Sequence, residues 1–142
     1  MPAPVQPQPL IAVSDVRRAA DWYARVLGVA ATHGGDEYEQ LRTDGALILQ
    51  LHARDVEHHH GAIGDPAAPV GNGVALWFEL ASFDAAVERV RAVGATVVTD
   101  VHVNPNAGHR EIWLQDPDGY LVVLAEAEPP SSRRATSTTA TA

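Results

Sequence analysis

The chain has 142 residues, the length of one domain, and its hydrophobic content of 46% is typical of a globular protein. Its net charge of −8 argues against general binding to nucleic acid or to an anionic membrane, because phosphate binding requires a basic face. The absence of cysteine excludes disulfides and thiolate catalysis, and the absence of lysine excludes Schiff-base chemistry. We expect a cytoplasmic protein, since no signal peptide and no apolar run of membrane-spanning length is found.

The first half of the chain predicts a strand, a helix and a hairpin, over residues 9–13, 14–28 and 38–52. Ser14 or Asp15 is suited to cap the helix, and Gly28 stands where a helix end needs a positive φ. Apolar residues recur along the helix at the spacing of one buried face. The Thr43-Asp44-Gly45 turn joins the two strands of the hairpin.

The second half repeats this order, with a strand, a helix and three strands over residues 73–80, 82–94, 96–103, 110–115 and 120–126. Asp-Gly precedes the last strand of each half, at Asp44-Gly45 and Asp118-Gly119. Two tandem βαβββ modules, at about 8–60 and 72–126, explain the repeat most simply. We therefore predict one domain over residues 1–127, followed by a disordered Ser/Thr/Ala/Pro-rich tail over 128–142.

The repeat, the S-D-x6-W-Y-x3-L-G pattern of the first helix and the D-P-D-G turn at 116–119 resemble the glyoxalase/bleomycin-resistance/dioxygenase superfamily, the vicinal-oxygen-chelate proteins. The resemblance extends from about Leu10 to Glu126. It implies an α+β fold in which two βαβββ modules form curled mixed sheets around a cleft. It also implies a homodimer whose cleft is shared between the chains.

Metal-dependent members of this family draw one ligand, usually His or Glu, from each of four strands. Matched residue by residue, these positions fall on Gln8, Gln50, Gly73 and Val123. Two amides, a glycine and a valine are a poor ligand set for a divalent first-row metal, which prefers imidazole and carboxylate donors. We therefore expect no metal at the family's usual place and no other cofactor, as in metal-free binding proteins of the bleomycin-resistance type.

Side chains alternate across a strand, so Val123 is expected to face the cleft while Val122 and Leu124 pack on the helices. The same alternation, together with a rim loop at 103–111, predicts the ligand contacts Trp77, Trp113, His52, Gln50, Glu111, Glu79, Val123 and His109. Apolar walls with aromatic rings and a few polar groups are typical of small-molecule sites. The favoured hypothesis is sequestration of a small aromatic or cationic molecule between Trp77 and Trp113, since indoles stack on flat rings and attract cations.

Two alternatives remain open at this point. A glyoxalase-like lyase, isomerase or dioxygenase could use a displaced metal held by His52, Glu111 or His109. A structural or interaction module would instead have its cleft closed by packed tryptophans. The histidine tract Glu57–Gly61 is interpreted as a solvated or lid-like loop with adventitious metal affinity.

Overall fold

A computed structural model of the chain describes residues 5–56 and 63–127. The elements of the first half are β1 (Leu10–Val13), α1 (Val16–Leu27), β2 (Ala30–Ala31), β3 (Tyr38–Thr43) and β4 (Ala46–Ala53). Those of the second half are β5 (Ala75–Leu80), α2 (Phe83–Val93), β6 (Thr96–Val103), β7 (Arg110–Gln115) and β8 (Leu121–Glu126). The predicted α+β fold of two βαβββ modules is confirmed. None of the helices in the described ranges is long and apolar enough to cross a membrane.

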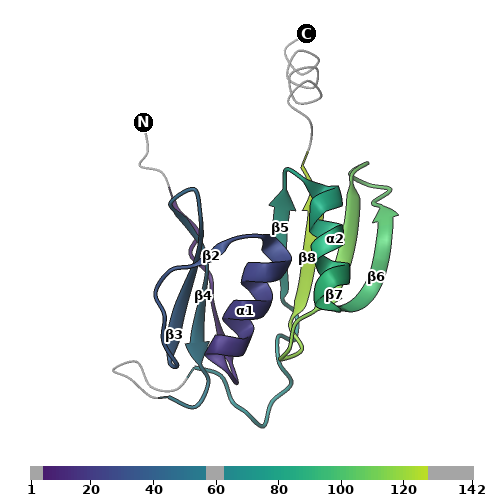
Figure 1. The fold of residues 1–142 in the computed structure, drawn as a ribbon. Helices are drawn as coiled ribbons and strands as arrows, with labels where there is room; N and C mark the ends of the chain where they lie inside the picture. The colour runs from purple at the N-terminus through teal and green to yellow at the C-terminus, as the bar shows by residue number, and fades with distance from the viewer. Residues whose placement is uncertain (1–4, 57–62, 128–142) are drawn as a thin grey trace.

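Each module forms its own four-stranded mixed sheet, in the orders β1-β4-β3-β2 and β5-β8-β7-β6. The first strand of each module runs parallel to the last, and the remaining neighbours are antiparallel. A parallel pair needs a crossover connection, which α1 and α2 contribute. Figure 1 shows α1 beside the first sheet, on the side of the second module, and α2 in front of the second sheet. The sheet faces that the helices leave uncovered are therefore the candidate ligand surfaces.

The ends of α1 are fixed by local chemistry. The Asp15 carboxylate accepts a hydrogen bond of 3.0 Å from the backbone N–H of Arg18, so Asp15 rather than Ser14 caps the helix. Gly28 ends the helix with φ of 70°, as predicted. Ser82 occupies the corresponding position before α2 but makes no side-chain capping bond there.

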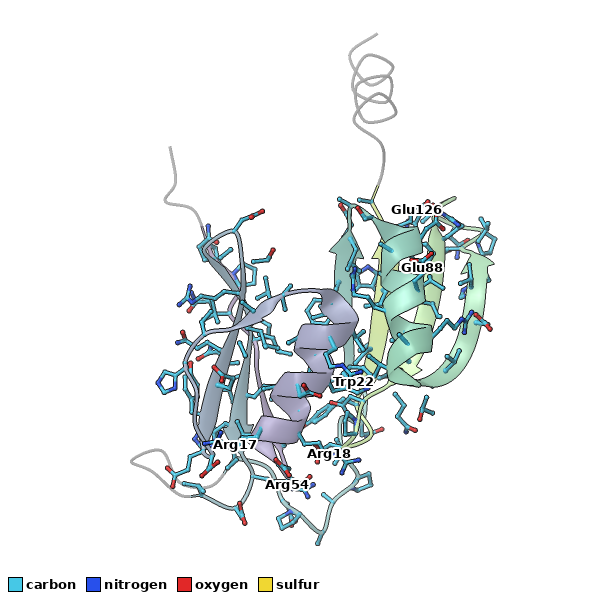
Figure 2. The ribbon with its side chains drawn as sticks, viewed as in Figure 1. Arg17, Arg18, Trp22, Arg54, Glu88 and Glu126 are labelled. Atoms are coloured by element: carbon cyan, nitrogen blue, oxygen red, sulfur yellow. The ribbon has the colours of Figure 1, made fainter. Side chains whose placement is uncertain are left out.

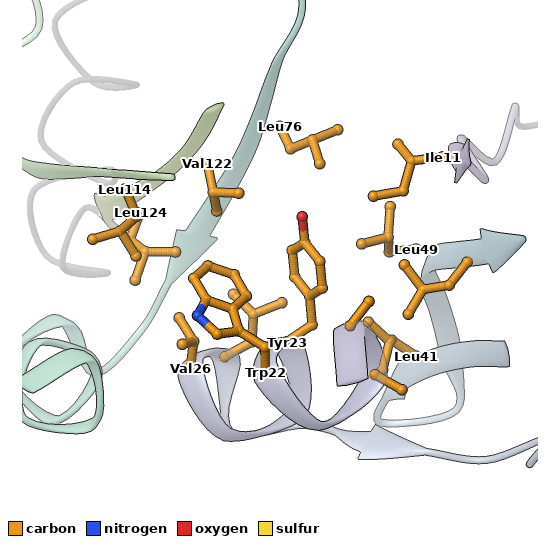
Figure 3. Close-up of a cluster of buried hydrophobic side chains, with 14 of the residues drawn as sticks. Ile11, Trp22, Tyr23, Val26, Leu41, Leu49, Leu76, Leu114, Val122 and Leu124 are labelled. Carbon is orange, nitrogen blue, oxygen red and sulfur yellow. The ribbon is translucent and has the colours of Figure 1, made fainter. Parts of the chain in front are cut away.

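The hydrophobic core is continuous between the two modules because α1 contributes to both. Tyr23 is fully buried on α1, and its ring meets that of Trp22 edge to face at 4.8 Å between centroids. Figure 2 shows Trp22 between α1 and the second module, and Figure 3 shows both rings between side chains of the two sheets, Leu41 and Leu49 on one side and Val122 and Leu124 on the other. Helix α1 thus packs between the two modules and holds them together.

The Asp116–Gly119 turn joins the second module to the first. The buried Tyr23 hydroxyl donates to Asp116 Oδ2 at 2.6 Å, and the Tyr120 hydroxyl donates to the Ala12 carbonyl at 2.8 Å. The other oxygen of Asp116 accepts from three backbone N–H groups of the turn, at 2.8 to 2.9 Å. The turn therefore joins two strands and also links the modules through these hydrogen bonds, which we call the lock between the modules.

The structure departs from the predicted elements in three places. Strand β2 was not predicted, because two alanines carry no alternation. Strand β5 begins at Ala75, so Gly73, predicted at the start of this strand, lies in the loop before it with φ of 78°. Leu41 pairs with Leu49 and Arg42 with Leu47, which leaves Ile48 unpaired in a bulge. Ile48 is partly buried and packs against the core.

Candidate functional site

Two tryptophans and a valine form the floor of the open face of the second sheet. In the strand register, Trp77 of β5 and Trp113 of β7 both pair with Val123 of β8, so the three side chains share a face. Val123 is 0% exposed, while Val122 and Leu124 point to the helix side and lie in the core, as the alternation predicts. The position at which metal-dependent relatives are expected to carry a glutamate is thus a buried apolar contact.

The two indoles form a corner. Their centroids are 6.2 Å apart with 84° between the ring planes, which is an edge-to-face contact. Trp77 is 48% exposed, whereas Trp113 is partly buried. A flat molecule would therefore stack on the open surface of Trp77 rather than between two parallel rings.

Glu111 organises the polar side of this corner. This residue is only 1% exposed, and its carboxylate accepts hydrogen bonds from Trp113 Nε1 at 2.9 Å, Asn104 Nδ2 at 2.7 Å and His109 Nε2 at 2.6 Å. Burial alone would raise the pKa of the Glu111 carboxyl, but the hydrogen bonds outweigh it and hold this pKa below its usual value. Glu111 is thus an ionised group whose oxygens are occupied by hydrogen bonds within the protein, and these bonds hold the Trp113 and His109 rings in place.

The remaining predicted residue of this sheet, Glu79, lies on the same face. Glu79 pairs with Ala125, which also pairs with Glu111, so the two glutamates occupy one row across the sheet. The second sheet therefore brings together six of the predicted contacts, namely Trp77, Trp113, Glu79, Glu111, Val123 and His109.

The open face of the first sheet is lined by amides. The Tyr38 hydroxyl donates to Gln50 Oε1, Gln40 Nε2 donates to the Tyr38 oxygen at 3.1 Å, and Gln50 Nε2 donates to the Gln8 carbonyl at 2.9 Å. His52 pairs with Tyr38 in the register and is buried, with Nδ1 donating to its neighbouring carbonyl at 2.7 Å. The Gln50 side chain thus reaches Gln8, but at its backbone carbonyl and as one member of a chain of hydrogen bonds.

The donor chemistry for a metal does not assemble within the described part of the chain. His52 belongs to the first sheet, whereas Glu111 and His109 belong to the second. Among residues 5–56 and 63–127, no three or more His, Cys, Asp or Glu side chains form a group that could hold a metal ion. The histidine tract at 57–61 and the tail at 128–142 lie outside the described residues.

A groove of about 860 Å³ lies between the edge strand β5 of the second sheet and the first module. It is lined by β5, by the tip of the β3–β4 hairpin, by the C-terminal end of α1 and by Gln6, Pro7 and Pro9. Trp77 and Glu79 line this groove as well as the open face of the sheet. Because β5 is an edge strand, the groove exposes unpaired backbone groups beside apolar side chains.

Sequence reasoning missed three residues that complete the two faces. Tyr38 could have been found only if the bulge at Ile48 had been anticipated, because a regular hairpin sets Tyr38 opposite Leu51 rather than His52. Asn104 and His102 could not, because β6 has two register shifts before it reaches Glu111. His102 Nε2 lies 3.8 Å from Glu111 Oε1, so two imidazoles flank one buried carboxylate.

Comparison with known proteins identifies the family. No curated protein matches the chain, but the family model described as the Glyoxalase/Bleomycin resistance protein/Dioxygenase superfamily matches residues 6–124. An integron cassette protein from the mobile metagenome of V. cholerae is 20% identical, with a TM-score of 0.67 over 90% of this chain and 98% of that one.

Two further solved structures share the fold. TioX from Micromonospora sp. ML1 is 21% identical, with a TM-score of 0.65 over 82% of this chain and 94% of that one. A lactoylglutathione lyase from Agrobacterium tumefaciens is 19% identical, with a TM-score of 0.62 over 89% and 95%. At this level of identity, the solved structures support the fold alone. With its duplicated βαβββ modules and the match to the family model over residues 6–124, the chain belongs to the glyoxalase/bleomycin resistance protein/dioxygenase superfamily.

Proposed function

We propose that this protein binds and sequesters a small planar aromatic molecule, neutral or cationic, on the exposed face of Trp77, without a metal ion. The observation that carries the proposal is the burial of Val123 beneath Trp77 and Trp113. An apolar floor at this position provides a stacking surface, and it has no donor atom for a metal. The negative charge of Glu111 behind the rings favours a cation over an anion.

The other three family metal positions support the same conclusion. The Gln50 side-chain amide is already bonded to Tyr38 and to the backbone carbonyl of Gln8, the Gln8 side chain is itself an amide, and Gly73 has no side chain. Amide oxygens carry no charge to balance a divalent cation. The chain then resembles, in its use of the cleft, the bleomycin-resistance type of binding protein rather than a glyoxalase-like lyase or dioxygenase.

Calorimetric titration with two planar probes tests the proposal. 2-Methoxynaphthalene is neutral and N-methylquinolinium is cationic, and both are expected to bind equally well with and without EDTA. Trp77→Ala should weaken both by roughly tenfold, because stacking and cation–π contacts contribute about 1–2 kcal/mol. Val103→Ala removes an apolar side chain of β6 that is 60% exposed, and it is the matched control that should bind like the wild type. Absence of binding, or binding that Trp77→Ala leaves unchanged, would refute the proposal.

We further propose that the protein acts as a homodimer in which the partner covers the β5 groove and completes the cleft. The support is the unpaired edge of β5, together with Val74 and Trp77, which are each 48% exposed beside the groove. Analytical ultracentrifugation should give a dimer, and Val74→Asp should shift it toward the monomer. Val98→Asp, on the opposite edge strand β6 and 54% exposed, should leave the dimer intact. A wild-type monomer at micromolar concentration would contradict this arrangement.

A further inference from the structure

The protonation of the His109 ring can be assigned from its neighbours. Both oxygens of Glu111 accept N–H hydrogen bonds, which favours the ionised carboxylate, and an ionised carboxylate can only accept hydrogen bonds. The indole N–H of Trp113 and the amide of Asn104 are donors to the same carboxylate. At 2.6 Å from Glu111 Oε2, the Nε2 atom of His109 must therefore carry a proton.

A neutral imidazole with its proton on Nε2 has a lone pair on Nδ1. Within the described part of the chain, Nδ1 of His109 has no hydrogen-bond partner. Among the described residues, every buried side-chain nitrogen or oxygen has a hydrogen-bond partner. Because Nδ1 of His109 has none, it must be exposed to solvent. Glu111 thus turns His109 into an accessible hydrogen-bond acceptor.

This acceptor stands beside the proposed stacking surface. The ring of His109 meets that of Trp77 at 6.3 Å between centroids, with 73° between the planes. A molecule lying on the open face of Trp77 would have its edge close to the imidazole. An acceptor at the edge of a stacked ring selects for a donor on that ring.

We propose that His109 is the polar anchor of the site and that its Nδ1 accepts a hydrogen bond from an O–H or N–H group of an aromatic ligand stacked on Trp77. The inference rests on the proposed function and names its ligand class: phenols and aromatic amines. Aromatic carboxylates are disfavoured, because the lone pair and the nearby Glu111 charge both repel an anion. In this role Glu111 is a positioning residue that acts through His109.

Two probes that differ by one donor test this inference. 2-Naphthol carries a hydroxyl where 2-methoxynaphthalene carries a methoxy group, and both are titrated at the same pH of about 8. The wild type should bind 2-naphthol about five times more tightly, as expected for one hydrogen bond. His109→Phe should abolish the preference while 2-methoxynaphthalene still binds. His33→Phe, an exposed histidine beside Tyr38 in the first sheet, should retain the preference.

The role of Glu111 needs a readout that a purely structural role would not change. The long-range 1H–15N spectrum of the histidine rings, assigned with His109→Phe, should show the proton of His109 on Nε2 in the wild type. Glu111→Gln should mix the two tautomers and reduce the 2-naphthol preference, because an amide can donate to the ring as well as accept from it. A wild-type proton on Nδ1 would overturn the inference even if the variants did not fold.

The outcomes separate the two proposals. Equal affinity of the wild type for both probes, with binding that still depends on Trp77, would overturn the role of His109 and leave the proposed function intact. Failure of both probes to bind would overturn both proposals. A preference for 2-naphthol that persists in His109→Phe would mean that another residue accepts the hydrogen bond of the ligand. That result would overturn the proposal for His109.

Discussion

Removal of the Tyr23 hydroxyl tests the lock between the modules. Tyr23→Phe keeps the ring in the core but leaves Asp116 Oδ2, in a side chain only 5% exposed, without its 2.6 Å donor. Loss of a hydrogen bond to a charged, buried group costs about 1.5–3 kcal/mol. With a urea m-value of about 2 kcal/mol/M, the midpoint should fall by roughly 1 M with m unchanged.

Tyr120→Phe is the matched control for this variant. It also removes a hydroxyl that bridges the modules, but the acceptor is the neutral carbonyl of Ala12. The expected cost is therefore smaller, about 0.5–1.5 kcal/mol. An equal or smaller loss of stability for Tyr23→Phe than for Tyr120→Phe would show that the buried Asp116 carboxylate does not depend on Tyr23.

The pH dependence gives a second check on the same variant. Burial raises the pKa of Asp116, while the bond from Tyr23 opposes that rise. A carboxyl whose pKa is raised by folding binds more protons in the native state, so stability falls as the pH rises through that window. Tyr23→Phe should raise the pKa further, and the stability gap to the wild type should widen from about pH 4 toward neutrality. A gap independent of pH would contradict this account.

Three further predictions concern single positions. Gly28→Ala should destabilise the fold more than Gly94→Ala, as measured by urea unfolding. Both glycines have φ near 70°, but only at Gly28 would an added Cβ meet another group, the Arg89 guanidinium at 2.9 Å. Glu111→Gln should make the free energy of unfolding fall less steeply with decreasing pH. A carboxyl whose pKa is lowered by folding stabilises the fold above about pH 4.5 and loses this effect as the pH falls through its pKa in the folded state. An unchanged dependence of the unfolding free energy on pH would contradict this. Val123→Glu should cost on the order of 3 kcal/mol or more and confer no metal in elemental analysis, because the carboxylate would be buried without a partner.

Periodicity alone predicted the elements that position the site. Leu121–Glu126 alternates between faces without a bulge, so Val122 and Leu124 reach the core and Val123 faces the other way, as expected. The ends of α1 were predictable for the same reason, since Asp15 and Gly28 act on backbone groups within one turn. Local chemistry and a regular period are both visible in sequence.

The partners across strands were not predictable. The register of β6 shifts between Val97 and Thr99 and again between Thr99 and His102, and each shift changes which residues face the site. Glu111 therefore appeared in sequence as a ligand contact, whereas the structure commits it to Trp113 and His109. The burial of that carboxylate depends on non-local pairing that no short pattern encodes.

The measurement that tests the central claim most directly is the metal content of the protein purified without an affinity tag, by elemental analysis and native mass spectrometry. A variant with His58, His59 and His60 replaced by alanine removes the tract most prone to adventitious binding. The account predicts no stoichiometric divalent metal in this variant and unchanged binding of 2-methoxynaphthalene. One divalent metal ion per chain in the same variant, required for binding of the probe, would contradict it.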